Sequence, residues 1–279
     1  RPLSPKLRDT DMRLEWMDDQ SIDAQVVGGW LDSFGYELPA EEGESWCRFM
    51  NEFQMTGTDN INRLYPLATV PMQDGKRAAK VLEEAMAGGF KGVMIGTQPN
   101  GISGNMDDPD LDPFWEAASG LGATVYLHPM FGCGDPRLND FALMNAVGRG
   151  TDTTTAVSRL LFSGHFLKYS GMKFVLSHGG GAIPYMMGRL AKNYEIHPGQ
   201  YSDPVASFRK LYFDSVLFAP DALNFLCSSC GHDKVILGSD YPFPIGDMTP
   251  LKVIDEAGFT DPQRNMIVGE TAAKLFGIS

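Results

Sequence analysis

Residues 173–184 read KFVLSHGGGAIP. A short apolar run leads through a serine to His178, and three glycines follow it. Such a run, bounded by glycines, predicts a buried β-strand that ends at the histidine. Glycines allow the backbone to turn sharply and allow another molecule to approach closely. We therefore expect His178 to face a ligand, with the glycines keeping the space in front of it open.

Similar apolar runs recur along the chain and alternate with amphipathic segments. Segments 74–89 and 151–170 show helical periodicity, and such alternation is typical of a parallel sheet covered by helices. No linker or low-complexity tract is visible, so residues 1–279 are predicted to form one domain. The predicted strands cover residues 22–29, 64–70, 90–97, 123–130, 173–180, 211–218 and 234–241.

The strand pattern favours a closed, TIM-type (β/α)8 barrel. Such a barrel has eight strands in about 250 residues, and a first strand upstream of Arg1 would complete the set. The alternative is an open doubly wound sheet. No glycine-rich phosphate-binding turn follows the first predicted strand, which disfavours that alternative.

Three polar residues stand where predicted strands end: His128 in VYLHP, His178 in VLSHGGG and Asp240 in VILGSD. In a barrel of parallel strands these ends meet on one face, where active sites lie. A buried imidazole or carboxylate without a partner costs several kcal/mol, so each must be paired or bound to something. Any one of them alone could be structural. Together, two histidines and an aspartate suit zinc or a similar divalent ion.

Composition excludes several classes of partner. The formal net charge of -12 argues against nucleic acid or an anionic membrane surface, and no apolar run is long enough to span a bilayer. The cysteines form no disulfide framework, which predicts a reducing compartment and a cytoplasmic location. Cys227-Ser-Ser-Cys230 has no second such pair, so we interpret it as two buried thiols at a helix end.

Three stretches together resemble a known family. VYLHP, FVLSHGGGAIPYMMGR and KVILGSDYPFPIG are similar to the aminocarboxymuconate-semialdehyde decarboxylase group of the amidohydrolase superfamily. The likeness extends from RPLSPKLRDTDMRLEWMD at the start to TAAKLFGI at the end. It implies a distorted (β/α)8 barrel with one metal ion in each subunit. Zinc is expected, and another divalent ion such as Mn²⁺ is possible.

The resemblance also implies roles for individual residues. His128 and Asp240 match metal ligands, and a His-x-His pair would lie on the first strand, upstream of Arg1. His178 matches the histidine that moves protons beside the metal, and Asp240 is a second candidate for proton transfer. Superfamily members with two metals usually bridge them with a carboxylated lysine on the fourth strand. Segment 90–97, FKGVMIGT, has no lysine at its carboxyl end, so a single metal is expected.

Substrate-binding residues are predicted from the same resemblance. Arg1 matches an arginine that binds a substrate carboxylate, and Arg189 matches one that reaches the site from a neighbouring subunit, which predicts a homodimer. Guanidinium groups bind carboxylates through two parallel hydrogen bonds, which suits a dicarboxylate substrate. After His128 the family commonly reads HPWDM, whereas this chain reads HPMFG. Met130 and Phe131 therefore replace the aromatic contact to substrate.

The resulting prediction is a metal-dependent, non-oxidative decarboxylase of an unsaturated or aromatic carboxylic acid, with no organic cofactor. A hydrolase or hydratase on the same scaffold is the nearest alternative, because the same metal chemistry serves water addition. Carbon dioxide release without uptake of water separates the two. A catalytically silent binding protein is a third possibility, and failure to bind metal would favour it.

Overall fold

The structure is a computed structural model that describes residues 4–132 and 134–278, and all of its strands pair in parallel. Each predicted strand is present, in a shorter form. The strands are β1 Gln25–Val27, β2 Leu64–Pro66, β3 Val93–Gly96, β4 Thr124–His128, β5 Lys173–Leu176, β6 Leu211–Asp214 and β7 Val235–Ile236.

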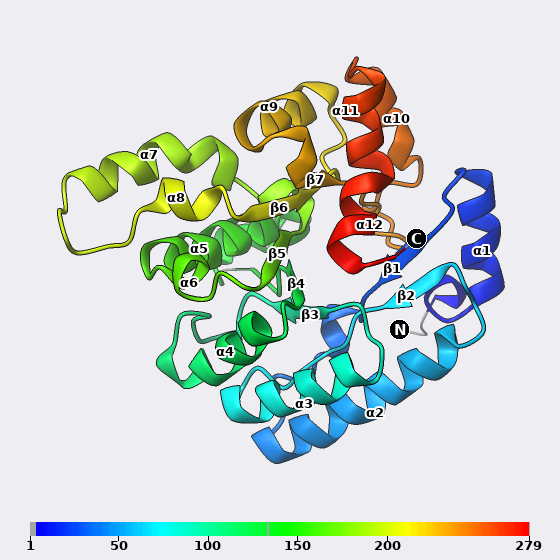
Figure 1. Cartoon of the computed structure of the whole chain (residues 1–279), viewed down its shortest axis with the longest axis horizontal. Coiled ribbons are helices and arrows are strands. Elements are labelled where there is room, and N and C mark those ends of the chain that lie inside the picture. The colour runs from blue at the N-terminus through cyan, green and yellow to red at the C-terminus, as the bar shows by residue number, and fades with distance from the viewer. Residues whose placement is uncertain (1–3, 133, 279) are drawn as a thin grey trace.

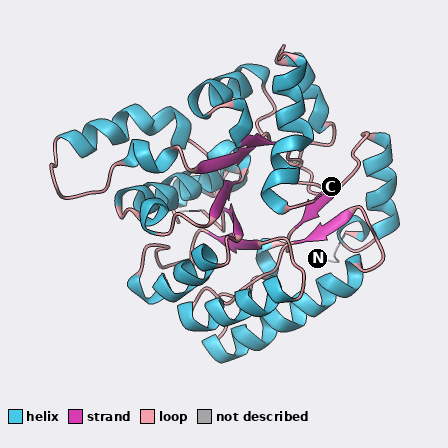
Figure 2. Ribbon diagram, in the orientation of Figure 1, coloured by secondary structure: helices cyan, strands magenta, loops and turns pink. Residues whose placement is uncertain are grey.

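The strands follow one another in chain order around a curve (Figure 2). β1 pairs with β2, and β3 to β7 form a second sheet in the order β3-β4-β5-β6-β7. A bridge between Ala68 and Val93 joins the two sheets. Within the described residues the outer edges of β1 and β7 have no strand partner, so the ring is open at that point. The predicted parallel α/β architecture is confirmed, while the predicted first strand lies outside the described residues.

Helices surround the strands (Figure 1). A 3₁₀ turn at Pro5–Leu7 precedes the first helix, and a π-helical turn at Met144–Gly148 leads into α5. None of the described helices is long and apolar enough to cross a membrane. The helices are α1 Thr10–Asp19, α2 Ala40–Thr58, α3 Gly75–Ala87, α4 Asp112–Gly120, α5 Arg149–Phe162, α6 His165–Lys168, α7 Ile183–Glu195, α8 Pro204–Phe208, α9 Pro220–Cys230, α10 Pro250–Glu256, α11 Asp261–Asn265 and α12 Thr271–Phe276.

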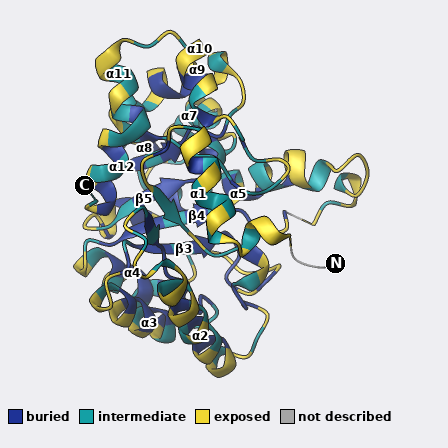
Figure 3. Cartoon of the chain, turned by 90° about the vertical axis from the view of Figure 1, so that its right-hand side faces the viewer, coloured by how far each residue is buried: buried dark blue, intermediate teal, exposed yellow. Residues whose placement is uncertain are grey.

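The two faces of the sheet bury different apolar clusters. On each strand, every second side chain points outward into a large core shared with the helices, as Val125 and Leu127 of β4 do. The remaining strand side chains point inward. Among them, Val175 of β5 and Ile236 of β7 pack on Phe276 of α12. Successive strand side chains point to opposite faces, so this division follows from the extended backbone. Buried residues accordingly line the centre of the molecule and exposed residues the outer helical faces (Figure 3).

The three glycines after His178 serve a different purpose from the one predicted. All three have positive φ, at 60°, 77° and 61°. A Cβ on Gly179 would lie 2.5 Å from Leu217, and one on Gly181 would lie 2.5 Å from the carbonyl oxygen of Gly150. None of the three lines the cavity described below. The prediction that they keep space open for a ligand was therefore wrong. Their lack of side chains makes room for other residues of this chain, such as Leu217 and Gly150.

This packing leads to a stability prediction for Gly181→Ala. Gly181 has φ 61° and ψ -128°, a region that is essentially restricted to glycine, and the new methyl group would meet backbone of α5. We expect a loss of about 2–3 kcal/mol in the free energy of unfolding, measured by urea denaturation. Gly188→Ala is the matched control. It lies inside α7 with open space around it, so alanine there should raise stability slightly. Equal stabilities for the two variants would contradict this account.

Candidate metal centre

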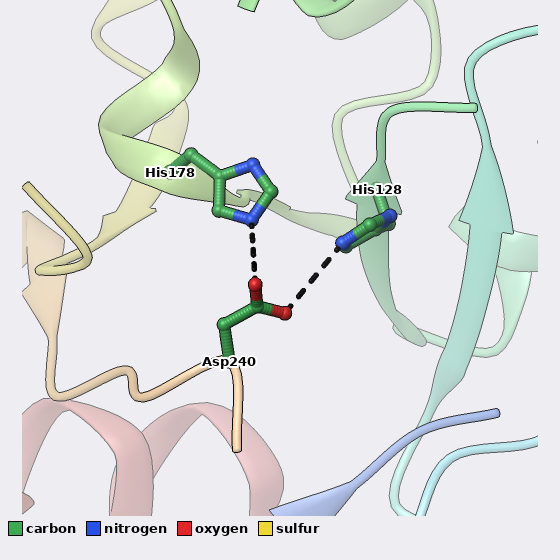
Figure 4. Close-up of side chains that lie close together, drawn as sticks. All are labelled: His128, His178 and Asp240. Carbon is green, nitrogen blue, oxygen red and sulfur yellow. Dashed lines mark ion pairs between the residues drawn. The ribbon is translucent and has the colours of Figure 1, made fainter. Parts of the chain in front are cut away.

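His128, His178 and Asp240 come from three neighbouring parts of the sheet and point toward one another (Figure 4). His128 is the last residue of β4, His178 follows β5 after one serine, and Asp240 lies four residues beyond β7. Parallel pairing places the carboxyl ends of these strands at one edge of the sheet. The convergence predicted from the sequence is therefore confirmed.

The three side chains are close enough to share one ion. His128 Nε2 lies 4.0 Å from Asp240 Oδ1, and His178 Nε2 lies 3.8 Å from Asp240 Oδ2. One potential ligand atom from each residue lies within 4.8 Å of the others. Ligand atoms about 2.0–2.2 Å from a zinc-sized ion are separated by distances of about 3–4 Å, so a small closing movement would suffice. These are the only three such residues that gather in this way within residues 4–132 and 134–278.

His128 is prepared to be a neutral ligand. Its Nδ1 lies 2.8 Å from the carbonyl oxygen of Pro129, so Nδ1 carries the proton and donates it to that oxygen. Nε2 therefore keeps its lone pair facing Asp240. Burial, with the positive charge of His178 in addition, lowers the pKa of His128 to about 3. A backbone oxygen that fixes the tautomer of a ligating histidine is a common feature of metal sites.

His178 experiences the opposite balance. Burial acts to lower its pKa, but the Asp240 carboxylate and the charge of Asp214 outweigh burial, so the pKa is raised. The two imidazoles, whose ring centroids lie 5.0 Å apart, thus favour different protonation states. Neighbouring titratable groups with separated pKa values are the usual sign of divided roles in a catalytic site.

The backbone is strained at two of the three residues. His178 has φ 52° and Asp240 has φ 54°, a region that residues other than glycine seldom adopt. Each such residue costs on the order of 1–3 kcal/mol and persists only where the surrounding structure imposes it, often at functional sites. Because His178 and Asp240 lie in turns after the strands, the alternation of side chains between the two faces of a strand does not set their direction.

The three residues line a cavity of about 1200 Å³. The lining includes the aromatic residues Trp30, Tyr241 and Phe243, and the rings of Trp30 and Phe243 lie 6.1 Å apart. Aromatic rings suit a planar substrate. Ser177, whose buried hydroxyl has no partner within the described residues, lies beside His178 on the same cavity. The cavity is large enough for a small organic acid and also extends along the open edge between β7 and β1.

Sequence reasoning missed Asp214, which is hydrogen-bonded to the backbone next to His178. Asp214 is 2% exposed at the end of β6, where its Oδ2 accepts a hydrogen bond of 2.8 Å from the Tyr126 hydroxyl. Its Oδ1 accepts hydrogen bonds from the backbone N–H groups of Gly179 and Val216, at 3.0 and 3.1 Å. Because Gly179 follows His178 directly, Asp214 holds the turn that presents the imidazole. Its position at a strand end was the signal that could have identified it.

A second missed acid organises the other side of the site. Asp152 is 5% exposed in the first turn of α5. Its carboxylate accepts hydrogen bonds from the Thr97 hydroxyl, the Gln98 amide and the backbone N–H of Met130. It thereby joins the loop after β3 and the loop after β4 to the helix. This helix begins with Arg149, a cavity residue that sequence reasoning also missed.

Several predicted substrate-binding residues do not line the cavity. Met130 is 2% exposed and packs in the core, where its Sδ would lie 2.4 Å from a Cβ on Gly96. Phe131 is 39% exposed and is also absent from the cavity wall. A direct contact between Met130 or Phe131 and substrate is therefore not supported. Arg189 is exposed on α7, away from the cavity of its own chain, and Arg1 lies outside the described residues.

The Cys-x-x-Cys pair lies at the end of α9, as predicted. Both thiols are free, and burial raises the pKa of Cys227 and of Cys230 to about 12. Cys227 is buried, as predicted, whereas Cys230 is only partly buried. A thiol needs its thiolate form to bind metal or attack a disulfide, and the raised pKa disfavours that form.

Comparison with known proteins places the chain in a family. The amidohydrolase family model matches residues 40–278, so the chain belongs to the amidohydrolase family. It is 28% identical to 2-amino-3-carboxymuconate-6-semialdehyde decarboxylase of Dictyostelium discoideum, across 100% of this chain and 79% of that protein.

Solved structures give the same picture. The structure of 5-carboxyvanillate decarboxylase LigW from Sphingomonas paucimobilis superposes with a TM-score of 0.87 and 27% identity, over 97% of this chain and 83% of the other. A 5-carboxyvanillate decarboxylase from Novosphingobium aromaticivorans, complexed with manganese and a nitrobenzoic acid, has a TM-score of 0.88 at 20% identity, over 96% of this chain and 80% of the other. The fold is thus that of the amidohydrolase barrels.

The Asp214 network leads to a prediction for Asp214→Ala. This change leaves the Tyr126 hydroxyl and two backbone N–H groups without their acceptor, so we expect a loss of about 3 kcal/mol in unfolding free energy. The pKa of the His178 imidazole should fall, because the Asp214 charge that helps to raise it is removed. Urea denaturation and an NMR titration of the histidines measure the two effects. Tyr126→Phe, which removes one hydrogen bond, is the control and should cost about 1 kcal/mol. An unchanged His178 pKa in Asp214→Ala would contradict this role.

Proposed function

We infer that this chain is a metal-dependent, non-oxidative decarboxylase of an aromatic or unsaturated carboxylic acid. The observation that carries the inference is the convergence of His128, His178 and Asp240 in one cavity. Similarity to the carboxymuconate-semialdehyde and carboxyvanillate decarboxylases over almost the whole chain supports the type of reaction. The aromatic residues among those that line the cavity support a conjugated substrate.

The residues present fit a divalent ion. His128 offers the Nε2 lone pair and Asp240 offers a carboxylate oxygen, and we propose these two as ligands. A divalent ion held there would stabilise the negative charge that develops on the substrate as carbon dioxide leaves. We propose zinc, which prefers the nitrogen and oxygen donors of this set, although the related carboxyvanillate enzyme is complexed with manganese.

His178 is proposed to hold and return the proton. Its pKa is raised while that of His128 is lowered, so of the two imidazoles His178 is the one that takes up a proton more readily. When a carboxylate leaves a conjugated carbon, that carbon must receive a proton. Nε2 of His178 faces the cavity beside Asp240 and is suited to deliver one. Asp240, 3.8 Å away, would stabilise the charged imidazolium before the transfer.

We also propose that a further parallel strand fills the open edge between β7 and β1 and brings the His-x-His pair of metal ligands. Both flanking edges lack strand partners within the described residues. The cavity between them has apolar walls that include Val26, Leu67 and Ile236. Unpaired strand edges next to an apolar surface favour the addition of a strand. A crystal structure of the metal-bound protein in which this edge remains open would contradict the proposal.

The function is tested by carbon dioxide release from a panel of conjugated mono- and dicarboxylic acids, with metal content measured on the same samples. We expect release without uptake of water in the wild type. His178→Ala should retain the metal and lose at least about 100-fold in turnover, because general acid catalysis contributes about that much. Asp240→Ala should lose both metal and turnover.

Other outcomes of this experiment point elsewhere. Water uptake without carbon dioxide would indicate the hydrolase or hydratase alternative. Absence of metal from protein supplied with zinc and manganese would indicate a binding protein. Parallel loss of metal in His178→Ala would make His178 a ligand instead of the proton carrier.

A homodimer in which Arg189 enters the partner's site is proposed on the family resemblance and on the exposed position of Arg189 in α7. The prediction is that Arg189→Ala and His178→Ala are each nearly inactive, but regain activity when mixed and allowed to exchange subunits. One mixed site then has both residues, so about a quarter of wild-type activity is expected in an equal mixture. No recovery in a mixture shown to exchange would contradict the shared site. The cytoplasmic location stays a prediction from cysteine usage.

A further inference from the structure

Three arginines line the cavity within the described residues, and two of them are already engaged. Arg264 donates from Nε to Asp255 Oδ1 over 2.7 Å. Arg13 donates to the Gln25 side chain over 2.7 Å and lies over the ring of Tyr241, 4.9 Å from its centroid. The third, Arg149, has a different environment.

The side chain of Arg149 makes one hydrogen bond within the described residues, from Nη1 to the backbone carbonyl oxygen of Met130 at 3.1 Å. Its Nε is shielded from solvent and has no acceptor within the described residues. No carboxylate in that part of the chain forms an ion pair with it, although Asp240, Asp32 and Asp152 are near enough to stabilise its charge. Buried donors without acceptors are rare in proteins and need an explanation.

The free edge of this guanidinium is the one suited to a carboxylate. With Nη1 tied to Met130, the Nε and Nη2 donors remain. The protein uses this same edge elsewhere: Arg48 binds Glu84 and Arg159 binds Asp107, each through Nε and Nη2. Two parallel N–H donors match the two oxygens of a carboxylate, and such pairs are stronger than single neutral hydrogen bonds.

The position of Arg149 is fixed relative to the metal centre. Its partner Met130 is two residues beyond His128, and Asp152 holds the backbone N–H of Met130 from the same helical turn. Arg149 lines the same cavity as His128 and His178. A carboxylate on Arg149 would therefore belong to a molecule that also reaches His178 and Asp240.

We propose that Arg149 binds a second carboxylate of the substrate, the one that the reaction retains. This deepens the proposed function, on which it rests, by assigning the substrate to the dicarboxylic acids. The carboxylate that is lost becomes neutral carbon dioxide. A strong ion pair to that group would stabilise the substrate more than the transition state and would slow the reaction. A guanidinium is therefore useful on the group that keeps its charge.

The test is binding of isophthalate and benzoate, which differ by one carboxylate, to the metal-loaded protein by calorimetry. The wild type should bind isophthalate more tightly. Arg149→Gln should weaken isophthalate binding about 10- to 100-fold, the range for a charged hydrogen-bonded pair, and leave benzoate within about threefold. Arg149→Lys keeps the charge but loses the two parallel donors, so its affinity for isophthalate should lie between those of the wild type and Arg149→Gln. Arg159→Gln, on the same helix but paired with Asp107 outside the cavity, is the control and should change neither affinity.

Each other result overturns the proposal. Equal affinities of the wild type for isophthalate and benzoate would contradict it without any variant. An equal fall in both affinities in Arg149→Gln, with metal content and melting temperature unchanged, would also contradict it. If Arg149→Gln fails to fold, full isophthalate affinity in Arg149→Lys would exclude bidentate binding. Binding is measured without turnover, so the result stands apart from the decarboxylase proposal. Selective isophthalate binding without carbon dioxide release would sink the latter alone.

Discussion

Parallel pairing of β4 to β7 is the constraint on which the site depends. It brings the carboxyl ends of strands that are separated by tens of residues to one edge of a sheet. Inward-pointing positions near that edge are polar, whereas those deeper in the strands pack on α12. A change of register by one residue would turn His128 into the helical layer, because strand side chains alternate between faces. The chemistry of the site is therefore inseparable from the pairing of the sheet.

Two buried carboxylates hold the loops at this edge in place through hydrogen bonds. Asp214 and Asp152 are almost fully buried, and each accepts hydrogen bonds from backbone and side-chain donors in two or more elements. Such a charge is tolerated in the interior because every oxygen has donors. Asp214 secures the turn at His178, and Asp152 secures the loop after His128. Two buried acids thus support the two histidines through separate hydrogen-bond networks.

Electrostatics then separates the two histidines. They lie close together and share Asp240 as a neighbour, yet burial dominates at His128 and the nearby carboxylates dominate at His178. One imidazole is consequently suited to donate a lone pair and the other to carry a proton. Arg149 completes the site with a guanidinium that has no carboxylate of its own within the described residues.

The amino-acid sequence by itself determined the seven strands, their alternation with helices, and the placement of His128, His178 and Asp240 at strand ends. These features are local, since they follow from apolar runs and from the residues that end them. Tertiary structure alone decided the purpose of the three glycines, the burial of Met130 and the importance of Asp214, Asp152 and Arg149. Those depend on contacts between residues far apart in the chain: Leu217 against Gly179, Tyr126 with Asp214, Met130 with Arg149. A periodic pattern shows which face a side chain occupies, but packing decides which neighbour fills that space.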